Sequence, residues 1–240
     1  MKENKLLRQF KDKQKHNKTW VKVLVPEPSI AFSYWEFDIK FMYVHGLGKY
    51  IPLLSVIDVK SRWLLGHLCQ ASIKKEDVKM FMEALTSVYI MPDKIQVRCD
   101  NGSQFESNLI QQYFASKDIY QEFTKPATPE QNAHIESYHS ILEKVICRQY
   151  LFEKEQDQLD TLNRWALFYN YQRIHSGTLY KSPYRALLED NIDVNQIFTK
   201  IEMENKSIFV ALNKKEACKA EVQNARDSLV DRNKRLSQNE

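Results

Sequence analysis

Polar and apolar residues alternate in a way that predicts the first three strands. In residues 33–44, SYWEFDIKFMYV, polar side chains that include Glu36 and Asp38 occupy every second position, which is the period of a β-strand. Apolar runs follow at 51–58 and 62–69, and a short polar segment separates them. Together the three segments predict an antiparallel meander.

The next part of the chain alternates between helical and strand patterns. Apolar residues spaced by three and four predict a helix over 75–90, which Pro92 would end. A strand at 95–100, a helix at 105–117 and a strand at 118–123 are predicted after it. This alternation is typical of parallel pairing. The chain is therefore predicted to be an α/β protein whose mixed five-stranded sheet has three antiparallel strands, then two parallel ones, with helices around it.

A loop and two longer helices are predicted next. Residues 124–131 contain two prolines and should form an irregular crossing, although Thr128 to Gln131 also match a capping box with proline at the first helical position. A helix should run from there to about Tyr150, and a second one should span 156–174. Ser176 and Gly177 should end the second helix.

The length and composition indicate one main domain with flanking segments. The chain has 240 residues, and domains usually have about 100 to 200. We expect a basic arm at 1–30, a core at 31–152, a helical part at 153–190 and a charged extension at 191–240. No apolar run approaches the ~20 residues that cross a bilayer, and the N-terminus lacks the apolar stretch of a secretory signal. A cytoplasmic protein without membrane segments is expected.

Cysteine and histidine spacing does not predict a metal site or disulfides. The four cysteines are far apart and form no C-x-x-C pair. His134, His139 and His175 do not have the H-E-x-x-H spacing of a zinc site. The net charge is +4, and the first 24 residues carry eight basic residues against two acidic ones. Such an arm can bind phosphates or merely keep the chain soluble, and charge alone does not separate the two interpretations.

Three carboxylates stand out, although each has an ordinary explanation. Asp38 lies in mid-strand, where Asp is disfavoured, but the wet face of an edge strand would accept it. Asp100 ends a predicted parallel strand, where ligand crevices form, yet Asp followed by Asn101 and Gly102 also favours a turn. Glu136, near the start of the long helix, suits the helix dipole. Only the set as a whole is informative.

The spacing and surroundings of these carboxylates resemble a known family. Thirty-five residues separate Asp100 from Glu136, and the segments WEFDIK, RCDNGSQF and PEQNAHIES resemble the three motifs of retroviral-integrase-like transposases of bacterial insertion sequences, with their D, D, 35, E signature. The segment 168–183, FYNYQRIHSGTLYKSP, resembles the end of that family's catalytic region. The resemblance covers residues 20–190 approximately and implies a ribonuclease H-like fold. It makes 31–152 the catalytic core and 153–190 its helical C-terminal part.

The resemblance also implies the chemistry. Clustered carboxylates repel one another unless cations neutralise them, and hard oxygen ligands suit Mg²⁺ or Mn²⁺. Two such ions about 4 Å apart can support in-line displacement at phosphorus. Asp38 would bridge both ions, and Asp100 and Glu136 would each complete one site. The expected activity is DNA strand cleavage and strand transfer, with water and then the freed 3′-hydroxyl as nucleophiles.

Further residues are expected to contact DNA. Glu136 and Glu143 share a helix face, because seven residues leave an offset of only about 20°. Members of that family commonly have Lys or Arg at the position of Glu143, where it would contact a phosphate of the DNA. The acidic residue here puts that phosphate contact in doubt. Lys125, Arg173 and Lys181 can line a DNA path or form a solvated face. The predicted DNA-binding set is Asn101, Lys125, Gln131, Asn132, Lys144 and Arg148.

The resemblance implies partners and leaves alternatives. Transposon ends and target DNA are the expected substrates, and a homo-multimer working at the bacterial nucleoid is expected because two ends must be handled together. The residues before the first strand are too few for a helix-turn-helix region, so an upstream protein of the same element, or the missing part of a truncated copy, should recognise the ends. A hydrolytic nuclease on the same fold and a non-catalytic DNA-binding or assembly protein remain alternatives.

Overall fold

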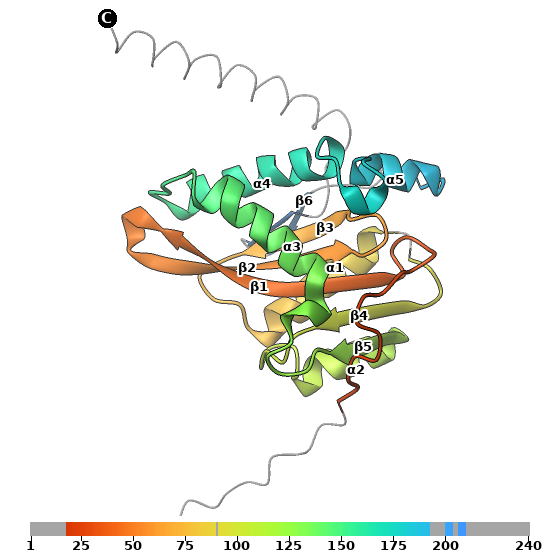
Figure 1. The fold of residues 1–240 in the computed structure, drawn as a ribbon. Coiled ribbons are helices and arrows are strands. Elements are labelled where there is room, and N and C mark those ends of the chain that lie inside the picture. Colours follow the sequence, from red (N-terminus) through yellow and green to blue (C-terminus); the bar gives the residue numbers. More distant parts are fainter. Residues whose placement is uncertain (1–17, 90, 193–199, 204–205, 210–240) are drawn as a thin grey trace, which may run out of the picture.

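A computed structural model describes residues 18–89, 91–192, 200–203 and 206–209 (Figure 1). Its strands form one sheet in the order β5-β4-β1-β2-β3-β7-β6. The strands are β1 (Tyr34–Val44), β2 (Lys49–Asp58), β3 (Leu64–Cys69), β4 (Ile95–Cys99), β5 (Ile119–Phe123), β6 (Lys200–Met203) and β7 (Lys206–Phe209). β1, β2 and β3 are antiparallel neighbours, whereas β4 is parallel to both β1 and β5. The predicted mixed sheet of three antiparallel and two parallel strands is therefore confirmed.

The sheet differs from the prediction at two places. β1 lies between β2 and β4, so interpreting Asp38 as part of an edge strand was wrong. β6 and β7, within the predicted charged extension 191–240, lengthen the sheet beside β3. A strand joins a sheet edge through backbone hydrogen bonds, so a segment with few large apolar residues can still add to the sheet. Most of that extension, like residues 1–17 of the predicted basic arm, lies outside the described residues.

Helices cover both faces of the sheet (Figure 1). Buried residues of α1 and α2 pack in one hydrophobic cluster with one face, and those of α3 and α4 pack in a second cluster with the other. The helices are α1 (Lys75–Val88), α2 (Asn108–Ser116), α3 (Ala133–Leu142), α4 (Glu155–Tyr171) and α5 (Pro183–Glu189). Short 3-10 helices lie at His45–Leu47, Pro129–Asn132 and Ser176–Thr178. No helix in the described ranges combines the length and apolar character needed to cross a membrane.

The predicted long helix to Tyr150 is shorter and irregular. α3 ends at Leu142 and continues as a π-helix, Glu143–Cys147. The predicted capping box does not form, because the Thr128 hydroxyl donates to the Lys125 carbonyl at 2.6 Å and caps no backbone N–H. A carboxylate from β1 accepts the first N–H groups of α3 instead, as described below.

The segment before β1 lies along the sheet as far as it is described. Val21 N donates to Phe123 O at 3.0 Å, and Phe123 N donates to Thr19 O at 2.8 Å, so this part of the predicted arm extends the ladder at β5. The boundaries proposed from the sequence remain predictions, since contacts alone do not define domains.

Candidate active site

The register of two parallel strands brings Asp38 and Asp100 to the same level. Glu36 on β1 pairs with Arg98 on β4, and Asp38 and Asp100 each follow these partners by two residues. β4 ends at Cys99, so Asp100 stands at the carboxyl end of the strand, where open α/β sheets form crevices. Gly102 N donates to Asp100 Oδ1 at 2.9 Å and holds this turn.

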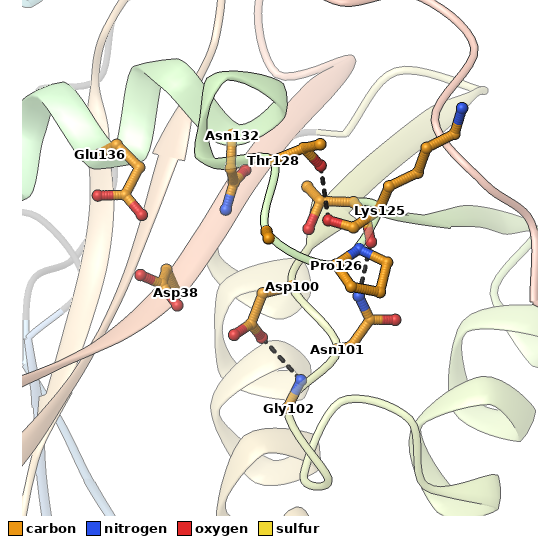
Figure 2. Close-up of a pocket in the computed structure, with 11 residues that line it drawn as sticks. Asp38, Asp100, Asn101, Gly102, Lys125, Pro126, Thr128, Asn132 and Glu136 are labelled. Atoms are coloured by element: carbon orange, nitrogen blue, oxygen red, sulfur yellow. Dashed lines mark hydrogen bonds between the residues drawn. The ribbon is translucent and has the colours of Figure 1, made fainter.

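Glu136 reaches the same place from α3 (Figure 2). A cavity of about 410 Å³ is bounded by all three carboxylates, by the loop after β4 and by the loop before α3. Its lining residues are Asp38, Asp100, Asn101, Gly102, Thr124, Lys125, Pro126, Ala127, Thr128, Asn132 and Glu136. Three segments far apart in the sequence therefore meet at one hollow of the surface.

The carboxylates of this cavity influence one another. Partial burial raises the pKa of Asp100, and the negative charges of Asp38 and Glu106 raise it further, against the Gly102 hydrogen bond that lowers it. Partial burial and the charge of Asp38 likewise raise the pKa of Glu136, while His139 and Lys40 lower it. The site thus concentrates negative charge that a cation would stabilise.

The donor chemistry of the cavity fits a hard divalent cation. Asn132 is 4% exposed, and its Oδ1 has no hydrogen-bond partner although it belongs to the cavity wall. Carboxylate and amide oxygens are the ligands that Mg²⁺ and Mn²⁺ prefer. Within the described ranges, no three acidic, histidine or cysteine side chains stand close enough together to form a ready-made cluster. Asp100 and Glu136 are only partly buried and line the cavity, so an ion in the cavity can reach their carboxylates.

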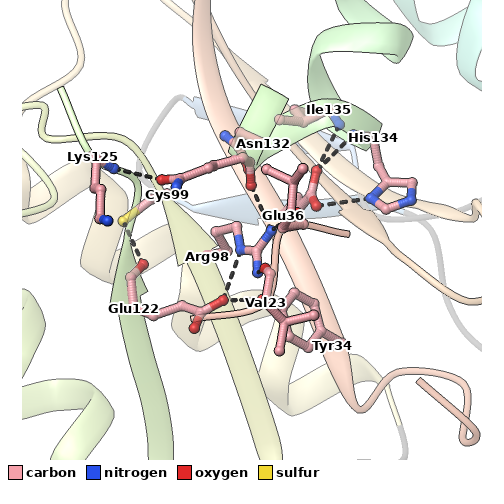
Figure 3. A network of polar contacts seen from close by, with 12 residues as sticks. Val23, Tyr34, Glu36, Arg98, Cys99, Glu122, Lys125, Asn132, His134 and Ile135 are labelled. Atoms are coloured by element: carbon pink, nitrogen blue, oxygen red, sulfur yellow. Dashed lines mark hydrogen bonds and ion pairs between the residues drawn. The ribbon is translucent and has the colours of Figure 1, made fainter. Parts of the chain in front are cut away.

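The position of α3 depends on a buried carboxylate that the sequence did not single out as functional (Figure 3). Glu36 is fully buried and accepts hydrogen bonds from His134 N at 2.9 Å and Ile135 N at 3.0 Å. His134 Nδ1 lies 2.8 Å from its other oxygen. These are the unpaired donors of the first helical turn. Glu36 therefore fixes the start of the helix that carries Glu136, and its place on the same strand side as Asp38 was the available signal.

A buried arginine ties the site to the surrounding loops (Figure 3). Arg98 is 1% exposed and pairs with Glu122 on β5 at 2.7 Å. Its guanidinium also donates to Gln131 O at 2.5 Å and to Val23 O at 2.7 Å. One side chain thus connects β5, the segment before β1 and the loop that enters α3. Sequence reasoning missed this role, because it depends on contacts across 33 to 75 residues.

A histidine lies beside Asp38. The Nδ1 atom of His139 is 3.4 Å from Asp38 Oδ2, and His139 is 5% exposed with its Nε2 unpartnered. His139 lies one helical turn after Glu136 and contacts the first carboxylate. Its spacing from Glu136 was visible in the sequence, but only the packing of α3 on β1 shows the contact.

The structure divides the residues predicted to bind DNA. Four of them lie at or beside the cavity. Asn101 is held there by its donation to Thr124 O at 2.6 Å, and Lys125 is exposed. Gln131 instead braces the loop, since its Oε1 accepts from Lys125 N at 2.7 Å. Asn132 belongs to the wall, as noted above. The other two, Lys144 and Arg148, are exposed and do not line the cavity.

Glu143, the acidic residue seven positions after Glu136, is neutralised by cations of the same chain. Glu143 Oε2 lies 2.8 Å from Lys40 Nζ, and its other oxygen lies 3.7 Å from Arg148 Nε. Lys40 lowers the pKa of Glu143 through a hydrogen bond and its charge. A cation from β1 therefore stands beside Glu143.

Comparison with known proteins places this geometry in a family. The transposase for insertion sequence element IS904 of Lactococcus lactis subsp. lactis (strain IL1403) is 28% identical over 129 residues, which are 53% of this chain and 51% of that protein. The chain thus spans about half the length of this relative.

Solved structures share the fold. The catalytic core domain of HTLV-2 integrase, in complex with magnesium in a dimeric form, is 18% identical with a TM-score of 0.50 over 66% of this chain and 97% of that one. The BIV integrase core gives a TM-score of 0.51 at 17% identity over 67% and 96%. The predicted ribonuclease H-like fold is thereby confirmed. Two models described as Integrase core domain match residues 28–129 and 117–183, from the segment before β1 to the start of α5, so the chain belongs to the integrase core domain family.

Proposed function

We propose that the chain is the catalytic part of a DNA transposase that cuts and rejoins the strands of an insertion sequence. The observation that carries this proposal is that Asp38, Asp100 and Glu136 line one cavity although they come from three separate segments. The likeness to the IS904 transposase supports transfer as the activity, and the magnesium-bound HTLV-2 core supports a divalent cation.

Asp38, Asp100 and Glu136 would hold the two Mg²⁺ or Mn²⁺ ions. When bound, such ions help to activate the attacking oxygen and stabilise the leaving one. In cleavage, the oxygen of water forms a bond to phosphorus and the bond to the 3′-oxygen breaks, which leaves a 3′-hydroxyl. In transfer, that hydroxyl forms the new bond to a target phosphorus and displaces the target's own 3′-oxygen. Asn132 and Lys125 stand where they can orient the strand.

Partners follow from the same proposal. DNA is the substrate, and a multimer would allow two transposon ends to be processed together. The HTLV-2 integrase core, for its part, has a dimeric form. Recognition of the ends by a helix-turn-helix protein of the same element stays a prediction.

The decisive experiment incubates the protein with strand-labelled DNA taken from both sides of its gene, in Mg²⁺, Mn²⁺ or EDTA. Asp100→Asn and Glu136→Gln are compared with wild type, and Glu130→Gln serves as the matched control because it is an exposed acid of the same loop region outside the cavity. The assay is run with and without any protein encoded upstream in the element.

We expect metal-dependent nicks and joined products that fall by at least about 10²-fold in the two carboxylate variants, a typical loss for a charge-stabilising group. Glu130→Gln should keep full activity. Nicks without joined products would favour a nuclease on this fold. Binding without any chemistry, unchanged by the substitutions, would favour a DNA-binding or assembly protein and contradict the proposal.

A further inference from the structure

A second cavity, of about 220 Å³, lies on the other side of α3 from the three carboxylates. Asn132 and Glu136 face the first cavity, whereas His134 and Ser137 line the second. The remaining wall includes two arginines, Arg62 and Arg173, with His175 and Gly177. Neither the carboxylate chemistry nor the core packing accounts for two guanidinium groups facing one hollow.

Separate turns hold the two arginines in place. Arg62 lies between β2 and β3 with a φ of 63°, and its Nη1 donates to the Val59 carbonyl. Its guanidinium packs on Gly177, where an added Cβ would lie 3.0 Å from Nη2 and 3.1 Å from Nε. Arg173 follows α4 and lies over the Tyr169 ring at 5.7 Å. The loop around Gly177 is therefore shaped to the side chain of Arg62.

Arg62 and Arg173 form no ion pair within the part of the chain that the structure describes. Among the described residues, no carboxylate lies within ion-pair distance of Arg62 or Arg173. Burial lowers the pKa of Arg62, and the charges of Glu36 and Asp58 raise it without an ion-pair contact. Glu36 is already bonded to the start of α3, and Asp58 accepts from Phe32 N and Ser61 N, both at 2.8 Å. Their oxygens are committed to other donors, so the arginines are left for an external anion.

The rest of the wall also suits an anion. Partial burial and then the charges of Arg173 and Arg62 lower the pKa of His175 to about 3. His175 is thus neutral near pH 7, and Arg173 Nη1 donates to its Nδ1 at 2.7 Å. The hydroxyl groups of Ser137 and Ser176 add further donors, and no carboxylate of the described part of the chain lines the cavity. Paired guanidinium forks with hydroxyl donors are typical of phosphate recognition.

We infer that this cavity binds a phosphate group of the DNA backbone, at a site separate from the phosphate that reacts at the carboxylates. The inference rests on the proposed function, because it takes DNA as the substrate. On this inference, one face of α3 lines the cavity for the reacting phosphate, and the opposite face lines a cavity that holds a second phosphate and keeps the DNA in register. The inference also gives the motif at 168–183 a direct role through Arg173 and His175.

The test measures DNA binding with cleavage removed. The full chain carrying Asp100→Asn is titrated against a labelled duplex at several salt concentrations, alone and with Arg173→Gln, Arg173→Lys or Arg62→Gln. Arg185→Gln is the matched control, since it removes an exposed arginine that lies outside both cavities. Thermal melts establish that each variant is folded.

Each phosphate contact contributes about −0.9 to the slope of log K against log salt. We expect Arg173→Gln and Arg62→Gln each to make this slope shallower by about 0.9 and to weaken binding about 10-fold, whereas Arg185→Gln changes neither. Arg173→Lys should recover part of the binding, because it keeps the charge but lacks the two-pronged donor. A parallel titration with inorganic phosphate, followed by NMR of the arginine Nε–H groups, should shift signals that Arg173→Gln removes.

Two outcomes would overturn the inference. One is an unchanged salt slope in both folded arginine variants. The other is a phosphate response at Arg173 without any effect on the slope, which would mean that the cavity takes free anions and not DNA. Because the assay needs no cleavage, it succeeds or fails independently of whether Asp38, Asp100 and Glu136 perform the chemistry.

Discussion

At the residue scale, the carboxylates at the cavity have properties that their neighbours impose. Asp100 and Glu136 are chemically ordinary acids, but partial burial and the charge of Asp38 raise the pKa of both. The protonated forms are therefore favoured by folding. Their stabilising contribution is present below the ordinary carboxyl pKa of about 4 and is lost as the pH rises through the raised value. At neutral pH the site carries repulsion that a cation relieves.

This electrostatic balance leads to a testable result. In EDTA at pH 7, Asp100→Asn should raise the Tm by at most about 2–4 °C, since a chain of this size shifts by that much per kcal/mol and solvent screens exposed charges. The gain should vanish near pH 4. Mg²⁺ should raise the Tm of wild type but not of Asp100→Asn or Glu136→Gln in a calorimetric scan. An equal Mg²⁺ effect on all variants, with Glu130→Gln as the control, would contradict a cation at this site.

At the scale of elements, the start of α3 is set by another strand. The sequence predicted a local capping box at Thr128, but the first free N–H groups of the helix are bonded by Glu36 of β1. A buried carboxylate with several donors is a stronger partner than the hydroxyl of a half-buried threonine such as Thr128. It also couples the helix that carries Glu136 directly to the strand that carries Asp38.

Removing this cap should loosen α3. We expect Glu36→Ala to lower the free energy of unfolding by about 3 kcal/mol, because it leaves buried donors unsatisfied. Glu36→Gln should cost about half as much, since it keeps one accepting oxygen. Urea denaturation measures both, and strand cleavage should fall in parallel. The exposed Glu130→Ala provides the comparison, and a Glu36→Ala variant as stable as that control would show that the cap is dispensable.

At the scale of the whole molecule, Arg98 joins parts that are distant in sequence. It contacts Glu122 on β5, the backbone of Val23 before β1 and the backbone of Gln131 before α3. The Tyr34 hydroxyl donates to the same Glu122 carboxylate. The network links β4 and β5 to the loop that leads to Glu136.

Breaking this network should be costly. Arg98→Met is expected to destabilise the fold by about 3–5 kcal/mol, because Glu122 remains buried without its partner. The double variant Arg98→Met with Glu122→Leu should recover part of the loss, since no uncompensated charge is left. Equilibrium denaturation of both variants tests this. A loss below about 1 kcal/mol in the single variant would mean that neither the ion pair nor the backbone contacts of Arg98 contribute much to the stability of the fold.

The sequence alone determined the order and type of the main elements, and it singled out three carboxylates that line one cavity in the structure. Strand and helix periods are local properties, so α1, predicted at 75–90, is found at Lys75–Val88. The spacing between Asp100 and Glu136 can likewise be read directly from the sequence. The π-helix after α3 and the strands β6 and β7 were missed, because they depend on packing and edge pairing.

Only the tertiary structure decided which residues distant in the sequence come into contact. The parallel register of β1 and β4 sets Asp38 beside Asp100, and the packing of α3 brings Glu136 and His139 to them. Arg62 and Arg173 line one cavity although their turns are separated by more than 100 residues. Local periodicity carries no information on such contacts, because they depend on how strands align and helices pack over the whole molecule.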